Sequence, residues 1–510
     1  MPLLLRADYP WMFSRRLTRL GASAALTGLA ANSCRSAAEA DAEADPVVIV
    51  GGGVIGRCVA WRLALAGSRV VLFDALNPVR GSWGETRASH LAMEDRTLLR
   101  MGLASTSEWH ALEEAYAAAA TAEGVDAATA EDAAERRFYF RAGRLFAGPI
   151  GSVGPVVSAV RSEVGADEVE VLTAAEANAR FPHLSLRDGV EECLYMRRGN
   201  VLSVNTALDA IGWAAARAGA ELHEAEGVEA IDRQRRTVTT SDGRTLRYSR
   251  LVLASGPWTN QTLTRCGLPL LPLVISNEQT LDFGEADGWA GPHYAVGSFP
   301  LFTWSEAGYK GRAAGGGCRY FYCVPTLDAD TSAAPPHART MGFKIGYHRQ
   351  GPLMETENFV LGEAGRACVG ALPHERKEVV AKQCYDETDE WALAATRAFV
   401  AEKLPGLDPQ KVTLQMRCLY QNTPDLGMIV GEHPADPRVV VLCGFSGSGF
   451  QFAPAIGEFV ARLIAGPGRP SRAKAAAAVE GGVAQMSDQQ HADIASRFTP
   501  SRFAREMGLS

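Results

Sequence analysis

The sequence predicts a mixed α/β fold in which a doubly wound, mostly parallel sheet is interleaved with a largely antiparallel portion. First, Pro46–Asp74 reads as an apolar strand, a glycine turn, an amphipathic helix and a second apolar strand. Second, the later apolar strands Arg250–Gly256 and Val439–Leu442 each lead through a small-residue turn into a helix. Third, residues 268–350 alternate strand and loop, and Ser241–Gly243 carries an Asp-Gly hairpin signal. The chain therefore leaves one sheet and re-enters it.

Glycines at a fixed spacing follow the first strand. Gly51, Gly53 and Gly56 form the pattern G-x-G-x-x-G, which permits a tight turn, close approach of backbone to a pyrophosphate, and packing of the next helix on the strand. The N-terminus of the helix Val54–Leu65 then faces the anion. Asp74 ends the second strand, where a carboxylate can bind ribose hydroxyls. The stretch predicts a site for NAD, NADP or FAD, and an ordinary strand-to-helix turn is the alternative.

Composition argues against two classes of partner. The 510-residue chain has a net charge of -7 and no sustained basic run, which argues against nucleic acid. It contains no run of 18 apolar residues, so we expect no transmembrane span. The cysteines are scattered singly, as in a reduced protein, and no pattern indicates a metal site.

Residues 1–45 form a leader that we expect to be cleaved or disordered. Ser14–Leu17, with two arginines ahead of the weakly apolar run Leu20–Ala31, is typical of a twin-arginine export signal, with Cys34 as a candidate lipidation site. The alternative is a mitochondrial or plastid transit peptide.

Two smaller segments carry local signals. Gly81–Arg87 is too polar for a strand and predicts a glycine-rich loop on the carboxyl edge of the sheet, where open α/β sheets bind ligands. Phe138–Phe146 predicts a pair of strands.

Several motifs in one order resemble a known family. They read GSWGETR, RLVLASGPW, GFKIGYH, CLYQNTPD and GFSGSGFQFAPAIGE. Together with the glycine turn they resemble the sarcosine oxidase and N-methyltryptophan oxidase branch of the FAD-dependent amine oxidases, within the D-amino-acid oxidase fold group, over residues 46–470. The resemblance narrows the cofactor to FAD.

The resemblance assigns cofactor-binding residues. Gly51, Gly53, Gly56 and Asp74 would hold the ADP half of FAD, while Thr86 and Arg87 lie on the loop beside the flavin ring. Backbone amides near the flavin would come from the later glycine turn, whose glycines are Gly444, Gly447 and Gly449. Cys418 falls on the position of the family's covalent attachment, which requires a thiolate and yields a thioether. A cysteine serving as a small buried apolar residue is the alternative.

Catalytic residues are also implied. Lys344 falls on the position of a lysine near the flavin that assists oxygen reduction, His348 and Tyr322 on cavity positions, and Arg87 on a contact with cofactor or substrate. Along GFKIGYH, Lys344 and His348 share one face by period two, and Phe343, Ile345 and Tyr347 share the other. Lys344 and His348 therefore point together, either into the cavity or into water.

Two positions depart from the family pattern. The arginine and the lysine that bind the substrate carboxylate in the family are here His90 and Gln451. Neither replaces a charged, bidentate guanidinium. We therefore expect a larger amine, a neutral amine, or an amine whose acid group is held elsewhere.

The fold class that follows is α/β: a Rossmann-like FAD-binding domain interleaved with a substrate domain on a largely antiparallel sheet. The expected FAD-binding segments are 46–130, 198–262 and 425–470, the substrate segments are 131–197 and 263–424, and 471–510 is a peripheral tail.

The expected function is oxidation of the C–N bond of a secondary amine or amino-acid derivative. A hydride passes to flavin N5, the imine hydrolyses, and O2 reoxidises the flavin to give H2O2. One alternative is a dehydrogenase that passes electrons to a quinone or carrier protein. The other is a non-catalytic flavin-binding module. We expect a monomer.

Overall fold

The computed structural model describes residues 45–77, 81–122, 136–287, 293–308, 319–327, 340–348, 351–354, 379–380, 387–466 and 486–509. The leader, most of the alanine-rich stretch 119–135 and much of 285–317 lie outside these residues.

A six-stranded sheet is built from segments that lie far apart in the sequence. Its first unit has the predicted bounds: β1 (Val47–Val50), α2 (Val54–Leu65) and β2 (Val70–Asp74). The strand order is β21-β22-β13-β1-β2-β9, and all pairs are parallel except β21 with β22. The remaining strands are β9 (Glu221–Glu224), β13 (Arg250–Leu253), β21 (Ile429–His433) and β22 (Asp436–Cys443).

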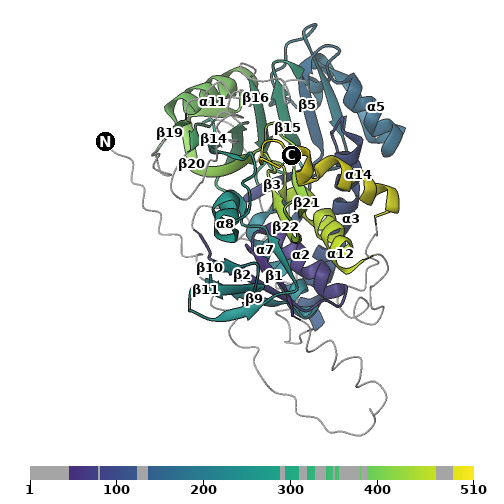
Figure 1. Ribbon diagram of the computed structural model, residues 1–510. Coiled ribbons are helices and arrows are strands. Elements are labelled where there is room, and N and C mark those ends of the chain that lie inside the picture. Colours follow the sequence, from purple (N-terminus) through teal and green to yellow (C-terminus); the bar gives the residue numbers. More distant parts are fainter. Residues whose placement is uncertain are drawn as a thin grey trace. The chain divides into compact units, whose positions relative to one another are not determined.

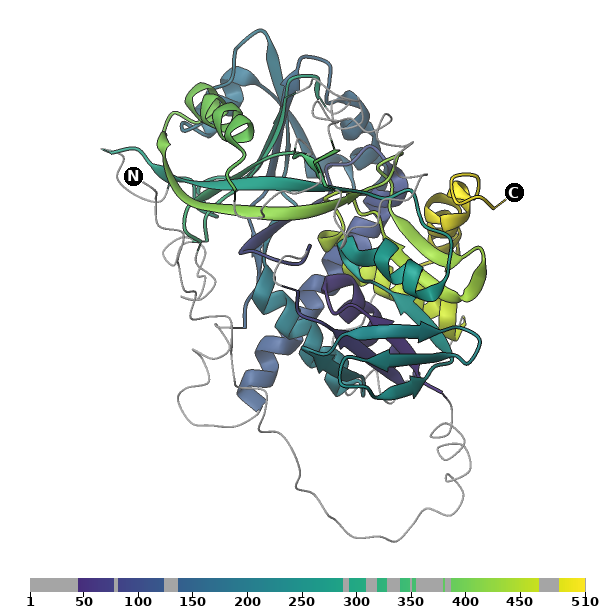
Figure 2. The ribbon, with the colours of Figure 1, turned by 60° about the vertical axis from the view of Figure 1, so that its left-hand side comes forward.

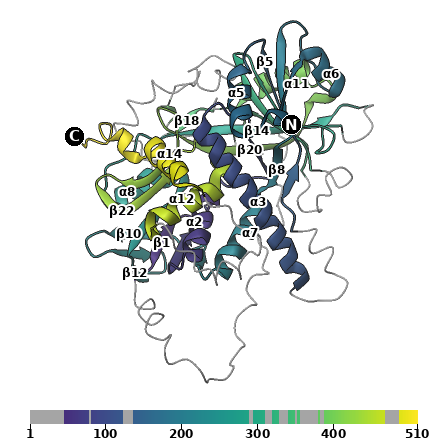
Figure 3. The ribbon, with the colours of Figure 1, turned by 90° about the vertical axis from the view of Figure 1, so that its right-hand side faces the viewer.

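The two faces of this sheet bury alternate side chains. Ile49 of β1 packs among the helices, whereas Val48 packs on the opposite face. The helical face is covered by α2, α7 (Val204–Arg217) and α12 (Ala453–Ala465), and α3 (Arg96–Ala122) runs beside the last two (Figure 3). The opposite face is covered by α8 (Thr259–Cys266) and a small sheet of β10 (Val228–Asp232), β11 (Thr237–Thr240) and β12 (Thr245–Arg247) (Figure 1). The predicted mixed fold is confirmed, with a sheet in place of helices over most of this second face.

The largest sheet is mainly antiparallel, as predicted. Its order is β19-β18-β14-β17-β16-β15-β5-β7-β6, with β20 paired to β14. Figure 2 shows β14 and β20 as two long neighbouring strands with α11 (Glu390–Lys403) above them. The strands are β5 (Arg144–Pro149), β6 (Val169–Thr173), β7 (Glu191–Met196), β14 (Val274–Glu285), β15 (Leu301–Ser305), β16 (Tyr320–Val324), β17 (Phe343–Tyr347), β18 (Leu353–Met354), β19 (Val379–Val380) and β20 (Leu407–Asn422). The helices α5 (Gly154–Glu163) and α6 (Ala174–Arg180) precede β6 and β7 respectively.

A third sheet corrects two local predictions. The loop predicted at Gly81–Arg87 ends in a strand, β3 (Thr86–His90), because β8 (Gly199–Ser203) supplies its backbone hydrogen bonds. The strands predicted within 138–146 do not pair with each other. Instead β4 (Tyr139–Arg141) joins β8, and Gly143, with φ +74°, turns the chain into β5 of the large sheet.

The described end of the chain contributes to the core. Helix α14 (Asp488–Phe498) buries Ile494 and Phe498 against the helical face of the parallel sheet, and Phe503 packs on the opposite face. The predicted domain boundaries stay predictions. Among the described residues, no helix combines the length and the hydrophobicity needed to cross a bilayer.

Candidate active site

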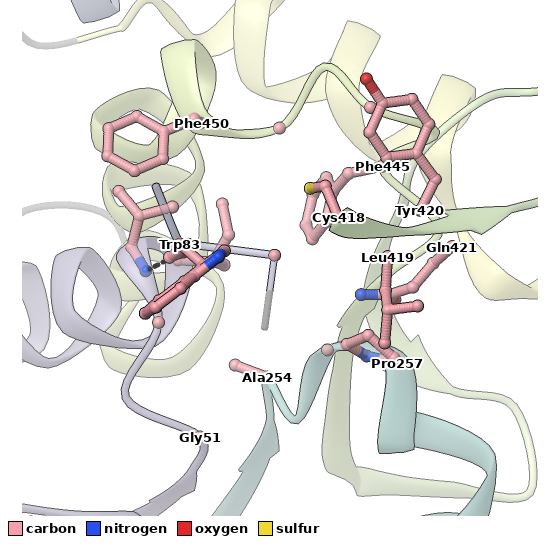
Figure 4. A pocket seen from close by; sticks show the side chains of 18 of the residues that line it. Gly51, Trp83, Ala254, Pro257, Cys418, Leu419, Tyr420, Gln421, Phe445 and Phe450 are labelled. Atoms are coloured by element: carbon pink, nitrogen blue, oxygen red, sulfur yellow. Dashed lines mark hydrogen bonds between the residues drawn. The ribbon is translucent and has the colours of Figure 1, made fainter. Parts of the chain in front are cut away.

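One cavity of about 670 Å³ connects the glycine turn after β1 with the face of the antiparallel sheet. Its walls include residues from β3, β16, β17 and β20 and from the second glycine turn at 444–449. Figure 4 shows Gly51 and Ala254 at one end, with Trp83 and Phe450 facing Cys418 and Tyr420 across the cavity. The same space is thus reached from both large sheets.

The first glycine turn leaves no room for side chains. Gly51 has φ +107°, and a Cβ there would lie 2.4 Å from the carbonyl oxygen of Ala254. A Cβ on Gly56 would lie 1.9 Å from the carbonyl oxygen of Gly51, so α2 can pack this closely only with glycine. Gly53 lines the cavity, whereas Gly56 supports the turn from behind.

The sequence prediction missed one residue of this turn, Gly52, and one residue of the neighbouring loop, Ser82. A Cβ on Gly52 would lie 2.8 Å from the Asp74 carboxylate, which lines the same end of the cavity. The backbone N–H of Val54 donates to Ser82 Oγ at 2.9 Å, so the loop supplies a cap at the start of α2. The run of three glycines was the available signal for Gly52, but nothing local pointed to Ser82.

Arg87 organises the loop on which it lies. Its guanidinium donates to the carbonyl oxygens of Thr86 and Gly81 at 2.8 and 2.9 Å, and also to that of Trp83. Thr86 and Arg87 both line the cavity, as predicted for this loop. Arg87 therefore fixes the loop while adding positive charge to the cavity wall.

Lys344 faces the cavity and not solvent. The alternate side chains Phe343, Ile345 and Tyr347 pack in the apolar core behind the sheet, and Lys344 is only 6% exposed. Its Nζ donates to the carbonyl oxygen of Thr86 at 2.8 Å. Burial, and then the nearby positive charge of Arg87, lower the pKa of Lys344 from 10.5 to about 8.

Two carboxyl groups lie close to Lys344. Asp282 of β14 is its partner across the β14–β17 pair, and Glu85 is hydrogen-bonded to Asp282. A hydrogen bond between two carboxyl groups requires a proton on one of them. Burial raises the pKa of both groups, which favours this protonated state and limits the negative charge beside Lys344.

Aromatic and sulfur groups line the wall beyond Lys344. The Tyr322 and Tyr420 hydroxyls lie 3.5 Å apart, and the His348 ring lies edge-on to both phenol rings. Burial raises the pKa of Tyr322 to about 12, so its hydroxyl keeps its proton. Burial also raises the pKa of the Cys418 thiol, although Arg87 and Lys344 act in the opposite direction. Cys418 lines the cavity, and the two nearby cations are Arg87 and Lys344.

The second glycine turn has three residues with positive φ, namely Ser446 and two glycines. Gly444 and Gly447 have φ +67° and +81°, and a Cβ on Gly447 would lie 2.3 Å from the Tyr420 ring. Gly447 and Gly449 line the cavity, whereas Gly444 only shapes the turn, its N–H donating to the Gln421 side chain at 3.2 Å.

His90 and Gln451 meet in the cavity wall. The backbone N–H of His90 donates to Gln451 Oε1 at 3.0 Å, and the Gln451 carbonyl accepts from the Trp109 indole at 3.2 Å. Both residues line the cavity. The structure therefore brings together the two positions at which the sequence departs from the family pattern.

The residues present fit FAD. At one end, side-chain-free backbone at Gly51–Gly53, the N-terminus of α2 and Asp74 suit a pyrophosphate and a ribose. The cavity continues to the antiparallel sheet, where a flavin ring would be reached by Cys418 and Lys344. In the described residues, no group of three or more His, Cys, Asp or Glu side chains is placed to hold a metal ion.

Proteins with similar amino-acid sequences agree with the assignment of this cavity to FAD. Monomeric sarcosine oxidase of Streptomyces avermitilis is 27% identical over 82% of this chain and 92% of that protein. Human peroxisomal sarcosine oxidase is 25% identical over 82% and 91%, and N-methyl-L-tryptophan oxidase of Yersinia pestis is 25% identical over 82% and 94%.

Solved structures show the same fold, and a family model shows the family. NikD, an amino acid oxidase of nikkomycin biosynthesis, has a TM-score of 0.59 and 21% identity, covering 90% of this chain and 98% of that one. The L-proline dehydrogenase of P. horikoshii has a TM-score of 0.58 and 19% identity, over 83% and 93%. The family model described as FAD dependent oxidoreductase, or DAO, matches residues 46–463. From this match over most of its length, the chain belongs to the DAO family of FAD-dependent oxidoreductases.

Proposed function

We propose that this enzyme oxidises the C–N bond of an amine, with O2 as the electron acceptor and H2O2 as a product. The observation that carries the proposal is that the buried Lys344 faces the same cavity as the Gly51–Gly53 turn. When bound, FAD supplies a two-electron acceptor for a hydride from the carbon beside the amine nitrogen, and oxygen then takes up both electrons. The sarcosine and N-methyltryptophan oxidases among the relatives support this substrate class.

The protein's own groups bind, orient and supply charge. Lys344, held by the Thr86 carbonyl, provides a positive charge that favours electron transfer to oxygen, because negative charge develops on oxygen in that step. Tyr322 and His348 form a wall that orients the amine and keeps water from the reacting carbon. Arg87 keeps the loop in place through its carbonyl contacts.

We extend the proposal to covalent attachment of FAD through Cys418. Attachment requires the thiol to lose its proton. Burial raises the pKa of this thiol, and the positive charges of Arg87 and Lys344 act against that rise. The sulfur would bond to the 8α-methyl carbon of the flavin, which loses a C–H bond. The two electrons released would pass to the flavin itself and then to O2, so that the product is a thioether to the oxidised flavin.

Anaerobic mixing with a panel of amines tests the activity. A secondary or primary amine should bleach the flavin, and admission of air should restore the colour with formation of one H2O2 per amine oxidised. Alcohols of matched shape serve as the control. If none of the secondary, primary and cyclic amines bleaches the flavin, the result supports the alternative of a non-catalytic flavin-binding module. Slow return of colour in air, with fast return on adding a quinone, would replace O2 by another acceptor.

Acid precipitation tests the attachment. The yellow colour should stay in the pellet of the wild-type protein and move to the supernatant in Cys418→Ser. Cys443→Ser is the matched control, because that cysteine is buried and lies outside the cavity lining. A colourless wild-type pellet contradicts attachment, and a yellow Cys418→Ser pellet contradicts the assignment of the residue.

A further inference from the structure

A buried arginine at the sheet end of the cavity is not explained by the cofactor. Arg144, the first residue of β5, is 3% exposed and lines the cavity. Its guanidinium donates to Thr303 Oγ1 at 2.6 Å, and Thr303 lines the cavity as well. Thr303 is the cross-strand partner of Tyr322, which places this contact on the same sheet face as the proposed catalytic wall.

The position of Arg144 is linked to that of His90. His90 pairs with Gly199 across β3 and β8, and a Cβ on Gly199 would lie 2.9 Å from the Cβ of Arg144. Glycine at 199 thus allows β5 to approach the strand opposite His90. A fixed positive charge therefore enters the cavity from β5, close to the place where β3 carries His90.

The charges of the cavity wall favour an anion at this end. At the glycine-turn end, the described lining contains the carboxylates Asp74 and Glu229 and the cation Arg265. Arg87, Arg144 and Lys344 line the other end, where the two carboxyl groups beside Lys344, Asp282 and Glu85, are not part of the lining. Arg87 donates to carbonyl oxygens of its own loop and keeps that loop in place. Lys344 donates to the Thr86 carbonyl oxygen and has the proposed role in the oxygen reaction. Arg144 is the cation of this set for which the cofactor and the oxygen step give no role. A guanidinium binds a planar carboxylate better than any other side chain does.

We propose that Arg144, supported by Thr303, binds an acid group of the substrate, so that the substrate is an amine carrying a carboxylate. The inference rests on the proposed amine oxidation, and it assigns the acid group to β5 and β15 in place of β3 and the segment around Gln451. Of the three substrate classes expected from the sequence, the inference favours an amine whose acid group is bound at a site other than His90 and Gln451.

Ligand binding without turnover tests the assignment. Purified holoenzyme is titrated with benzoate and with benzamide, which share a shape and differ in charge, and binding is followed by the change in flavin absorbance. The wild-type enzyme should bind benzoate more tightly. Arg144→Met should weaken benzoate binding about 10- to 100-fold, because a charge-assisted hydrogen bond is lost, while benzamide binding stays unchanged. Arg141→Met, which removes an exposed arginine three residues earlier, should leave both affinities unchanged.

Two further variants protect the test against misfolding. Arg144→Lys keeps the charge but loses the bidentate fork, and Thr303→Val removes only the supporting hydroxyl, so both should reduce the preference for benzoate partially. Equal binding of benzoate and benzamide by the wild type, or an unchanged preference in Arg144→Met and Arg144→Lys, overturns the inference. Benzoate selectivity that depends on Arg144 in an enzyme that no amine reduces would reject the proposed function and keep the anion site.

Discussion

Lys344 shows how a buried cation can be kept without a full counter-charge. It is held by a carbonyl oxygen, and burial raises the pKa of the two carboxyl groups beside it, which favours a proton between them and limits their negative charge. Burial, and then the positive charge of Arg87, lower the pKa of Lys344 to about 8, close to the working pH of most enzymes. Small changes in pH then change the fraction of the lysine that carries its charge.

This predicts a pH-dependent oxygen reaction. Below pH 8 Lys344 is mostly protonated and assists electron transfer to oxygen, so the reoxidation rate should fall as the pH rises through about 8. Lys344→Met should slow reoxidation about 100-fold and abolish this decline, with little effect on anaerobic reduction by the amine. Stopped-flow absorbance measures both half-reactions, and Lys411→Met, at an exposed lysine, is the control. Equal slowing of both half-reactions would assign Lys344 to folding or binding.

The glycine turn, considered as an element, was predictable to the residue. The bounds of β1 and α2 follow from an apolar run, a glycine spacing and a helical period, all of which are local. β3 was not predictable, because its polar sequence forms a strand only through pairing with β8. The contact of His90 with Gln451 joins residues 361 positions apart, and Arg144 lies in no motif. Local sequence patterns were thus sufficient to predict the cofactor end of the site. The substrate end depends on contacts between residues far apart in the sequence, which such patterns do not show.

A substitution at Gly56 should disturb the packing of α2 on the parallel sheet. In Gly56→Ala the new methyl would lie 1.9 Å from the Gly51 carbonyl oxygen, so the helix must shift. We expect a loss of about 3 kcal/mol or more in unfolding free energy and a marked loss of bound flavin. Flavin absorbance per protein and urea unfolding measure the two effects. Gly154→Ala, where no atom lies within 4 Å of the new methyl, should leave the flavin content unchanged and should not lower the unfolding free energy. Full flavin content in Gly56→Ala would contradict the proposed role of the turn.

Across the whole molecule, a buried charge cluster joins three helices. Arg62 of α2 lies 3.5 Å from the Glu108 carboxylate of α3 and 3.6 Å from that of Glu458 of α12. Burial raises the pKa of Glu108 from 4.5 to about 7, although Arg62 opposes the rise. The native state therefore binds a proton at Glu108 between these two pH values, where the unfolded state does not. Stability from this group is present at low pH and is lost as the pH rises through about 7.

Comparison of the wild type with Glu108→Gln should reveal this dependence. The unfolding free energy of the wild type relative to the variant should fall by roughly 3 kcal/mol at most between pH 5 and pH 8, given about 1.36 kcal/mol for each pKa unit. Urea titrations at the two pH values measure the difference. Glu94→Gln, at an exposed carboxylate, should show none. A difference that is the same at both pH values would mean that Glu108 stays ionised.

The cavity draws its walls from residues as far apart as Val50 and Gln451. During synthesis, the ribosome must therefore release almost the whole catalytic region before both ends of the FAD site exist together. The flavin can be enclosed only after this region has been synthesised. Enclosure also requires that β20 has paired with β14, which is synthesised about 130 residues earlier. FAD is thus enclosed late in the synthesis of the protein. An enzyme that already contains FAD is folded, so transport of this form between compartments requires a route that accepts folded proteins.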